Sequence, residues 1–277
     1  MKLQYLGTAA AEGIPAIFCT CETCRLARKT GGKNIRTRSQ ALIDDQLMID
    51  FPADTYLHCT AHGIDLTNIH HYLITHTHAD HLYPMDLHML RRGFANLPAD
   101  HPPYHFWGGK EMVEMLQPYV DIDRMDGRLI LHELTIGVPT MVGEHLVTAF
   151  PAQHGTVSPY IYLIERNGKS LLYANDTGAL LPDVWDYLFK ARQHLSAVSM
   201  DCTHGNKLVT KEGAGHMGFV NIQEICATLE QKGHIDFLTK RIVNHFSHNH
   251  PQVNYTDHAV YEDKGYIMSY DGLVVEI

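Results

Sequence analysis

The feature that most constrains the fold is a cluster of metal-binding side chains within six residues. His76, His78, Asp80 and His81 form an H-x-H-x-D-H motif directly after residues 71–75, which have the composition of a β-strand. Neutral imidazoles and carboxylates are common ligands of zinc, manganese and iron. Four such groups at the end of one strand predict part of a site for two divalent metal ions, in preference to a chance histidine-rich turn.

The rest of the chain alternates between strand-like and helix-like segments, which predicts an α/β protein built in layers. Asn167-Gly168 predicts a tight hairpin turn, and Asn221, with Glu224 three residues later, predicts the capped start of a helix. We interpret the proline-rich residues 93–103 as a loop near the mouth of the site. We expect strands at residues 3–6, 40–43, 46–50, 71–75, 145–150, 160–165, 170–174, 197–201 and 241–244. We expect helices at residues 84–92, 110–117, 183–193 and 221–232.

Three further residues can complete the metal site because each follows a predicted strand. They are His154, Asp176 and His245. Enzymes of the α/β class usually place their chemistry just past the carboxyl ends of strands. A lone histidine or aspartate at such a position is more often structural, but the three together with the motif favour a metal site.

A second cluster consists of thiols. Cys19, Cys21 and Cys24 form a C-x-C-x-x-C motif, and three thiols so close together can bind one tetrahedral zinc ion if a fourth ligand is supplied. A disulfide and a redox motif are the alternatives, but a stable disulfide is disfavoured in a reducing cytosol and would leave one thiol unpaired. His245 and His248 lie three residues apart, so one can belong to the metal pair and the other to the zinc.

The order H-x-H-x-D-H, His, Asp, His resembles that of the metallo-β-lactamase superfamily. The resemblance implies a four-layer αβ/βα sandwich with the metals at one edge of two sheets. It also implies a division of the ligands between two metal ions, with one bridging residue. The first ion is then held by His76, His78 and His154, the second by Asp80, His81 and His245, and Asp176 bridges both.

The N-terminal pattern resembles a narrower family, the phosphodiesterases that open phosphoribosyl cyclic phosphate. Gly7-Thr8 and Gly13-Ile14-Pro15 precede the three cysteines as in that family. The resemblance implies that His245 belongs to the metal pair and His248 to a structural zinc, and it implies a homodimer. One departure affects the substrate: the family tends to show a G-x-D-D-L-R-like stretch after the motif, and residues 83–92 keep only part of it.

The predicted reaction is hydrolysis of a small, cyclic phosphodiester by a hydroxide that bridges two zinc, manganese or iron ions. We expect His216 and Asp80 to be catalytic. His216, in the glycine-rich residues 213–218, is a candidate general acid. His204 is its rival, and Asp201 is a candidate to orient an imidazole that binds metal.

Composition favours a small substrate. The formal net charge is −9, and a negative surface repels the phosphate backbone of nucleic acids, whereas a metal pair can still attract a small anionic phosphodiester. Apolar segments are too interrupted for a membrane span or a secretory signal, so we expect a cytoplasmic protein. We expect a single domain over residues 1–277 that includes a zinc-binding loop at about residues 13–30.

Other functions stay open at this point. A tRNA 3′-end processing nuclease has the same metal ligands, but it usually carries a basic arm of which the sequence shows no sign. A lactonase, thioesterase or sulfur dioxygenase generally lacks the three cysteines. A PQQ-biosynthesis protein shares C-x-C-x-x-C but tends to lack an intact catalytic set, and it would not be a hydrolase.

Overall fold

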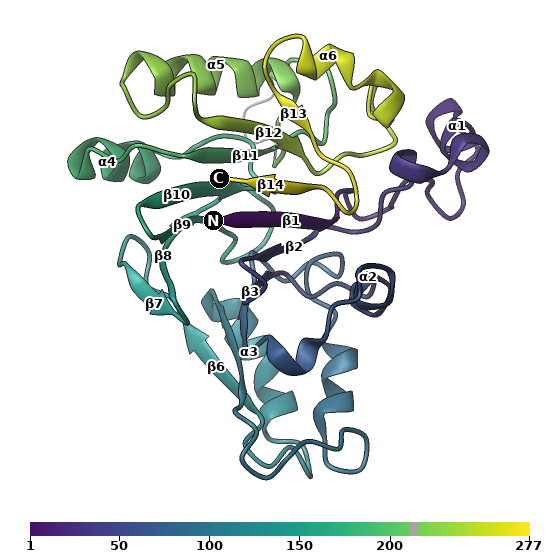
Figure 1. Cartoon of the computed structure of the whole chain (residues 1–277), viewed down its shortest axis with the longest axis vertical. Helices are drawn as coiled ribbons and strands as arrows, with labels where there is room; N and C mark the ends of the chain where they lie inside the picture. The colour runs from purple at the N-terminus through teal and green to yellow at the C-terminus, as the bar shows by residue number, and fades with distance from the viewer. Residues whose placement is uncertain (211–214) are drawn as a thin grey trace.

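The fold is described by a computed structural model, which covers residues 1–210 and 215–277. Two seven-stranded mixed sheets face each other (Figure 1). In order across the first sheet, the strands are β14 (Val274–Glu276), β1 (Lys2–Gly7), β2 (Gln40–Ile43), β3 (Leu47–Ile49), β4 (His71–Leu73), β5 (Tyr104–Gly108) and β6 (Leu129–Glu133). In order across the second sheet, they are β13 (Ile267–Met268), β12 (Lys240–Asn244), β11 (Ala197–Asp201), β10 (Lys169–Ala174), β9 (Tyr160–Arg166), β8 (His145–Pro151) and β7 (Thr140–Val142).

Helices cover the outer faces of both sheets. In Figure 1, α5 and α6 lie above the sheets, α4 lies at the left beside β11, and α2 and α3 lie below. The α-helices are α1 (Glu22–Thr30), α2 (Thr55–His62), α3 (Lys110–Val120), α4 (Pro182–Ala191), α5 (Phe219–Gln231) and α6 (Ala259–Glu262). Short 3₁₀ helices are η1 (Gly32–Asn34), η2 (Leu66–Asn68), η3 (Pro84–Leu90) and η4 (Tyr255–Asp257).

Three apolar clusters hold these layers together. One lies between the two sheets and includes Leu73 and Tyr162. A second packs the outer face of the second sheet against α4 and α5, and a third packs the outer face of the first sheet against α3 and η3. The central strands are therefore buried on both faces, which explains why β9 and β10 consist largely of Leu, Ile and Tyr.

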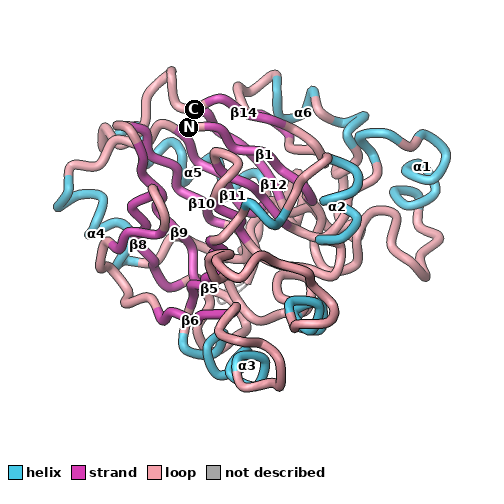
Figure 2. Tube along the Cα trace, turned by 60° about the horizontal axis from the view of Figure 1, so that its bottom comes forward, coloured by secondary structure: helices cyan, strands magenta, loops and turns pink. Residues whose placement is uncertain are grey.

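The two ends of the chain meet in the first sheet. β1 pairs antiparallel with β14, which brings Lys2 opposite Glu276, and the two termini lie side by side in Figures 1 and 2. Within the described residues, every helix is too short or too polar to cross a lipid bilayer.

The predicted layered α/β class is confirmed, as are the nine predicted strands within two residues at each end. The Asn167-Gly168 turn is confirmed too: both residues have positive φ, 52° and 74°, as a tight hairpin turn between β9 and β10 requires. Five strands and three α-helices of the described residues were not predicted. They are β5, β6, β7, β13, β14, α1, α2 and α6.

Three local predictions need correction. The helix expected at residues 84–92 is the 3₁₀ helix η3. The capped helix start expected at Asn221 lies three residues earlier, at Gly218. Asn221 is the third residue of α5, and its side chain accepts a hydrogen bond from the Gly218 N–H (3.2 Å). Finally, residues 22–30 of the expected zinc-binding loop form α1.

Candidate metal centre

The parallel strands deliver the predicted site residues to one edge of the sandwich. β10, β11 and β12 run parallel, so the residues that follow them lie at the same edge. Asp176, Asp201 and His245 are found there. In the facing sheet, β3 and β4 are also parallel, and β4 leads into the H-x-H-x-D-H motif.

The structure brings His76, His78 and His154 together into one group. The Nε2 of His76 lies 3.0 Å from the Nδ1 of His78, and the Nε2 of His154 lies 3.1 Å from the same atom. One ligand atom from each of the three lies within 4.8 Å of the others. Three nitrogens at this spacing can surround one divalent ion.

Asp80, His81 and His245 form a second group with the same spacing. The Nε2 of His81 lies 3.3 Å from Oδ2 of Asp80. Asp176 lies between the two groups: its Oδ2 is 3.0 Å from His81 Nε2 and 3.2 Å from His245 Nε2, whereas its Oδ1 faces His154 Nε2 at 3.8 Å. The two carboxylate oxygens of Asp176 thus face two different groups, as a bridging ligand must.

Orphaned polar atoms test whether these residues fit a metal. His81 Nε2, His245 Nε2 and Asp176 Oδ2 are all buried. Both nitrogens lie within 3.2 Å of that oxygen, but among the described residues none of the three atoms makes a hydrogen bond. Burying a polar atom without a partner is costly. The donor set, imidazole nitrogens and carboxylate oxygens, suits zinc, manganese or iron. The fit is therefore good, although metal binding itself stays a prediction.

Asp50, which sequence reasoning missed, holds the candidate ligand His81 in place. It is fully buried at the end of β3, and its Oδ2 accepts a hydrogen bond from Nδ1 of His81 (2.7 Å). Its Oδ1 accepts two more from the backbone and hydroxyl of Thr75 (2.8 Å each). Burial lowers the pKa of His81, but Asp176, Asp50 and Asp80 outweigh it and raise that pKa well above its ordinary value. An acidic residue at the end of a strand beside the motif strand was the available signal.

His216, the candidate general acid, lies beside the two groups of candidate metal ligands. Its Nδ1 is 2.9 Å from Oδ2 of Asp201 and 3.8 Å from Oδ1 of Asp176. Burial lowers its pKa, but the Asp201 carboxylate overcomes this and raises the pKa to about 9. Burial lowers the pKa of the rival His204. Gly213 and Ala214, which precede His216 in the expected glycine-rich stretch, lie outside the described residues.

Asp201 was expected to orient the imidazole of a metal ligand. In the structure it lies closer to His216 than to the nearest such ligand, His245. The Nδ1 of His245 is 3.6 Å from Asp201, but it lies only 2.8 Å from the hydroxyl of Thr203. Sequence reasoning missed Thr203, because a hydroxyl two residues after a strand carries no distinctive signal. Asp201 instead holds His216 and accepts a hydrogen bond from the backbone N–H of Asp176 (2.9 Å).

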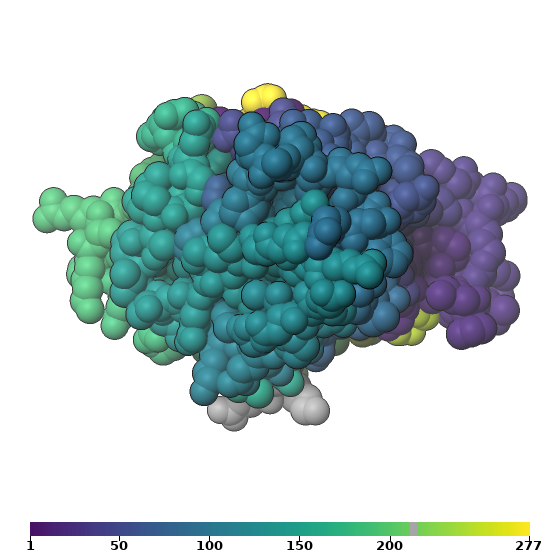
Figure 3. Space-filling view, turned by 90° about the horizontal axis from the view of Figure 1, so that it is seen from below, coloured from purple at the N-terminus to yellow at the C-terminus, as the bar shows by residue number. Residues whose placement is uncertain are grey.

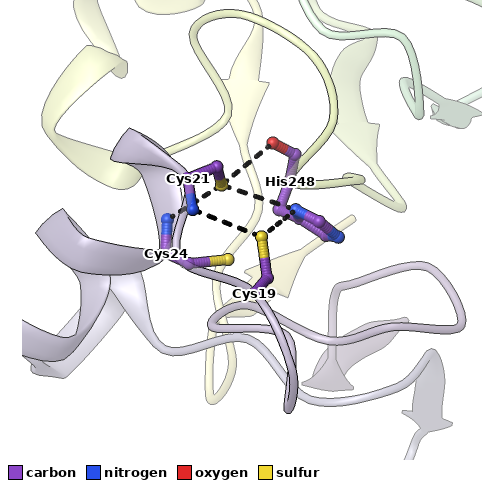
Figure 4. Close-up of side chains that lie close together, drawn as sticks. All are labelled: Cys19, Cys21, Cys24 and His248. Carbon is purple, nitrogen blue, oxygen red and sulfur yellow. Dashed lines mark hydrogen bonds between the residues drawn. The ribbon is translucent and has the colours of Figure 1, made fainter.

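The cysteine cluster closes around His248 (Figure 4). Nδ1 of His248 lies 3.4 Å from Sγ of Cys19 and 3.5 Å from Sγ of Cys21, and Cys24 completes a group within 4.8 Å. Burial raises the pKa of Cys21, but the Cys24 backbone N–H and His248 lower it to about 6, which favours the thiolate that zinc requires. All six cysteines belong to the described part of the chain and are free thiols.

The metal centre opens into a cavity of about 300 Å³. The residues that line it include His78, His154, Asp176, Glu12, His204 and His250. A larger cavity of about 480 Å³ lies between α2, η2 and η3, and its walls are mostly apolar. The loop at residues 93–103 borders this larger cavity, so its expected place at the mouth of the metal site is wrong.

A family comparison agrees with this geometry. The family described as "Beta-lactamase superfamily domain" matches residues 48–237, more than half of the chain. The chain belongs to the β-lactamase superfamily. The fold of this superfamily member is the metallo-β-lactamase fold, as the motif predicted. The search of curated protein sequences found no match.

Solved structures share the fold at low sequence identity. Zinc-bound PqqB from Methylobacterium extorquens is 20% identical over all of both chains, with a TM-score of 0.75. A diphosphatase from the PhnP family is 18% identical, with a TM-score of 0.70 over all of this chain and 96% of its own. The short form of human tRNase Z is 14% identical, with a TM-score of 0.67 over all of this chain and 99% of its own. At these identities the likeness concerns the fold.

Proposed function

We propose that this member of the β-lactamase superfamily is a metal-dependent hydrolase that cleaves a small, cyclic phosphodiester. The observation that carries the proposal is the position of Asp176, whose two oxygens face two separate groups of imidazole and carboxylate ligands. Two groups of ligands joined by one carboxylate would suit a pair of divalent ions, and such a pair would supply positive charge for displacement at a phosphate. Similar structures named as a diphosphatase and a tRNase support this reaction class.

The residues divide the work in a simple way. His76, His78 and His154 would hold one ion, Asp80, His81 and His245 the other, with Asp176 between them. When bound, two divalent ions supply positive charge for the phosphate and lower the pKa of water toward neutrality. The side chains keep the ligand atoms in place: Asp50 fixes His81 and Thr203 fixes His245.

His216 would supply the proton for the leaving alkoxide. Its Nδ1 lies against the Asp201 carboxylate at 2.9 Å, so the proton available to a substrate is the one on Nε2. Its side chain is 26% exposed and lines the cavity, so substrate can reach it. Burial lowers its pKa, but the Asp201 carboxylate raises it to about 9, which favours the protonated form that a general acid needs.

The test combines metal analysis with turnover. We expect three ions per chain, of which one resists a chelator, and hydrolysis of bis(p-nitrophenyl) phosphate when zinc or manganese is present. Asp176→Asn should abolish turnover while circular dichroism stays unchanged. Asp44→Asn is the matched control, because Asp44 also pairs with a histidine, His145, away from the cavity, and it should stay active. Full activity of Asp176→Asn would reject the proposal.

A second measurement isolates the acid. His216→Asn should lower kcat by roughly 10²–10⁴-fold for a phosphodiester with an alkoxide leaving group, the range typical of general acid catalysis. The loss should be much smaller with p-nitrophenolate, which leaves without a proton. Equal losses with both leaving groups would remove His216 from the acid role.

A further inference from the structure

Two consecutive apolar side chains are exposed to solvent beside the cysteine cluster. Ile17 is 70% exposed and Phe18 is 99% exposed, and we call this pair the apolar tip. It directly precedes Cys19, in the turn that leads into the cluster. Single exposed apolar residues are ordinary on a protein surface, but two adjacent ones on one turn form a small patch that a partner can cover.

Hydrogen bonds hold the turn that carries the apolar tip. The guanidinium of Arg28 donates to the carbonyl of Cys19 (2.7 Å) and to that of Ala16 (2.8 Å), the residues on either side of the tip. Arg25 donates to the carbonyl of Thr20. The backbone N–H of Cys19 also donates to the Ala16 carbonyl across the turn (3.2 Å). The tip is therefore displayed on a braced turn, so little conformational freedom is lost when a partner binds.

The same contacts place positive charge beside the tip. The acceptors for Arg25 and Arg28 are carbonyl oxygens, which do not neutralise a guanidinium, and Lys29 is exposed in the last turn of α1. Residues 13–33 contain four cationic side chains and one carboxylate, whereas the whole chain has a formal net charge of −9. A zinc ion on three thiolates would remove one positive charge, and the segment would stay positive.

The segment that carries the tip projects from the layered body. In Figure 1, α1 lies apart from the two sheets, and in Figure 3 the purple N-terminal residues form one end of the molecule. A stable protein–protein interface buries at least about 1,000 Å², more than two side chains offer. A lipid surface sets no such requirement, because apolar side chains enter the headgroup region while cations attract anionic lipids.

We propose that the apolar tip and the basic side chains of α1 dock this protein onto an anionic lipid membrane. Ile17 and Phe18 enter the headgroup region, and Arg25, Arg28 and Lys29 attract the lipid phosphate and carboxylate groups. The contact is peripheral and needs no membrane span. The negative charge on the rest of the chain opposes it little, because salt screens exposed charges beyond about 8 Å. The inference does not depend on the proposed phosphodiesterase activity.

Co-sedimentation with vesicles tests the proposal. The zinc-loaded wild type should bind vesicles of equimolar phosphatidylcholine and phosphatidylserine, and added salt should weaken the binding. The double variant Ile17→Ser, Phe18→Ser should lower the partition coefficient at least about tenfold, because two large apolar side chains no longer enter the lipid. Its melting temperature and zinc content should match those of the wild type. Absence of vesicle binding by the wild type would overturn the proposal.

A second exposed apolar pair supplies the matched control. Phe237 is 87% exposed and Leu238 is 69% exposed, in the turn before β12. Asp236 adds a carboxylate to that turn, where it accepts a hydrogen bond from the Leu238 N–H (2.8 Å). The double variant Phe237→Ser, Leu238→Ser should therefore bind the vesicles like the wild type. An equal loss in both double variants would show that the apolar tip is not the docking site.

Lys29→Gln tests the electrostatic part of the proposal. One cation near an anionic surface contributes about fivefold to binding, so this variant should bind the phosphatidylserine vesicles about fivefold more weakly than the wild type. The wild type should bind vesicles of phosphatidylcholine alone at least about tenfold more weakly than the mixed vesicles. Equal binding to both would overturn the preference for anionic lipid.

Light scattering separates a lipid partner from a second copy of the chain. The tip variant and the wild type should have the same molar mass in solution. If the wild type self-associates through the tip and binds no vesicles, the tip is an interface between copies and the membrane proposal is wrong.

Discussion

Replacing Asp50 with asparagine changes one hydrogen bond behind the metal centre while preserving shape. Oδ1 of Asp50 accepts two hydrogen bonds from Thr75 at 2.8 Å each, and Oδ2 accepts one from His81 Nδ1 at 2.7 Å. In Asp50→Asn the single oxygen stays with the two Thr75 donors, so the amide NH₂ turns to His81. The imidazole must then accept at Nδ1 and carry its proton on Nε2, the atom that faces Asp176 and Asp80.

A protonated Nε2 cannot bind a metal, so metal affinity should fall. Losing such a supporting contact typically costs 10–100-fold in metal affinity, which corresponds to roughly 1.4–2.8 kcal/mol because each tenfold is about 1.4 kcal/mol. The assay is competition for zinc with a chelating dye, combined with nitrogen NMR of the His81 tautomer.

Asp44→Asn is the control, since Asp44 makes a similar contact to His145 Nε2 (3.1 Å) away from the cavity. It should lose stability but not zinc affinity. If Asp50→Asn binds zinc as tightly as Asp44→Asn and the wild type, the assigned role of Asp50 is wrong.

Three further predictions concern stability. Cys21→Ala should lower the melting temperature and release one zinc ion, because zinc binding at this site is coupled to folding. The control Cys59→Ala should release none. An unchanged melting temperature of Cys21→Ala would contradict a structural zinc. Burial lowers the pKa of His71 to about 4 in the folded chain, so the unfolded chain takes up the proton first as pH falls. The free energy of unfolding should therefore decrease as the pH falls from about 6.5 to about 4. In urea titrations, His71→Gln should show a smaller decrease in this free energy between pH 7 and pH 5 than the wild type. An equal decrease would show that His71 is not a cause. Arg36 is 1% exposed and donates to the Thr8 hydroxyl at 2.8 Å and to the Ser269 carbonyl at 2.7 Å. Arg36→Met should therefore cost about 1–3 kcal/mol, because buried acceptors lose their donor, and a urea midpoint equal to that of the wild type would contradict this.

The sequence predicts those parts of the fold that carry their own signal. β9 and β10 were predictable because each is a continuous apolar run and the Asn167-Gly168 turn joins them. The short strands β7, β13 and β14 were not, because two or three residues carry no periodicity and are held by their neighbours. α1 was hidden because its residues read as part of a zinc-binding loop.

Some residues of the candidate site were predictable from the sequence and others were not. The H-x-H-x-D-H residues were predictable from their spacing, and His154, Asp176 and His245 from their positions after strands. Whether they met in space depended on which strands run parallel, and the sequence alone does not fix this. Asp50 offered only the weak signal of an acidic residue at a strand end, and its role depends on a contact with His81, 31 residues away. Thr203 offered no signal, because its role depends on a contact with the distant His245.

The pairing of early and late segments sets an order for assembly on the ribosome. Cys19 can contact His248 only after a further 229 residues have been synthesised. Similarly, β1 has no β14 partner until residues 274–276 have emerged. A nascent chain that ends before residue 245 lacks His245 of the candidate metal centre and His248 of the cysteine cluster. It also exposes the unpaired edge of β1, a surface prone to aggregation. Chaperone contact during synthesis should therefore persist until β14 has emerged and paired with β1.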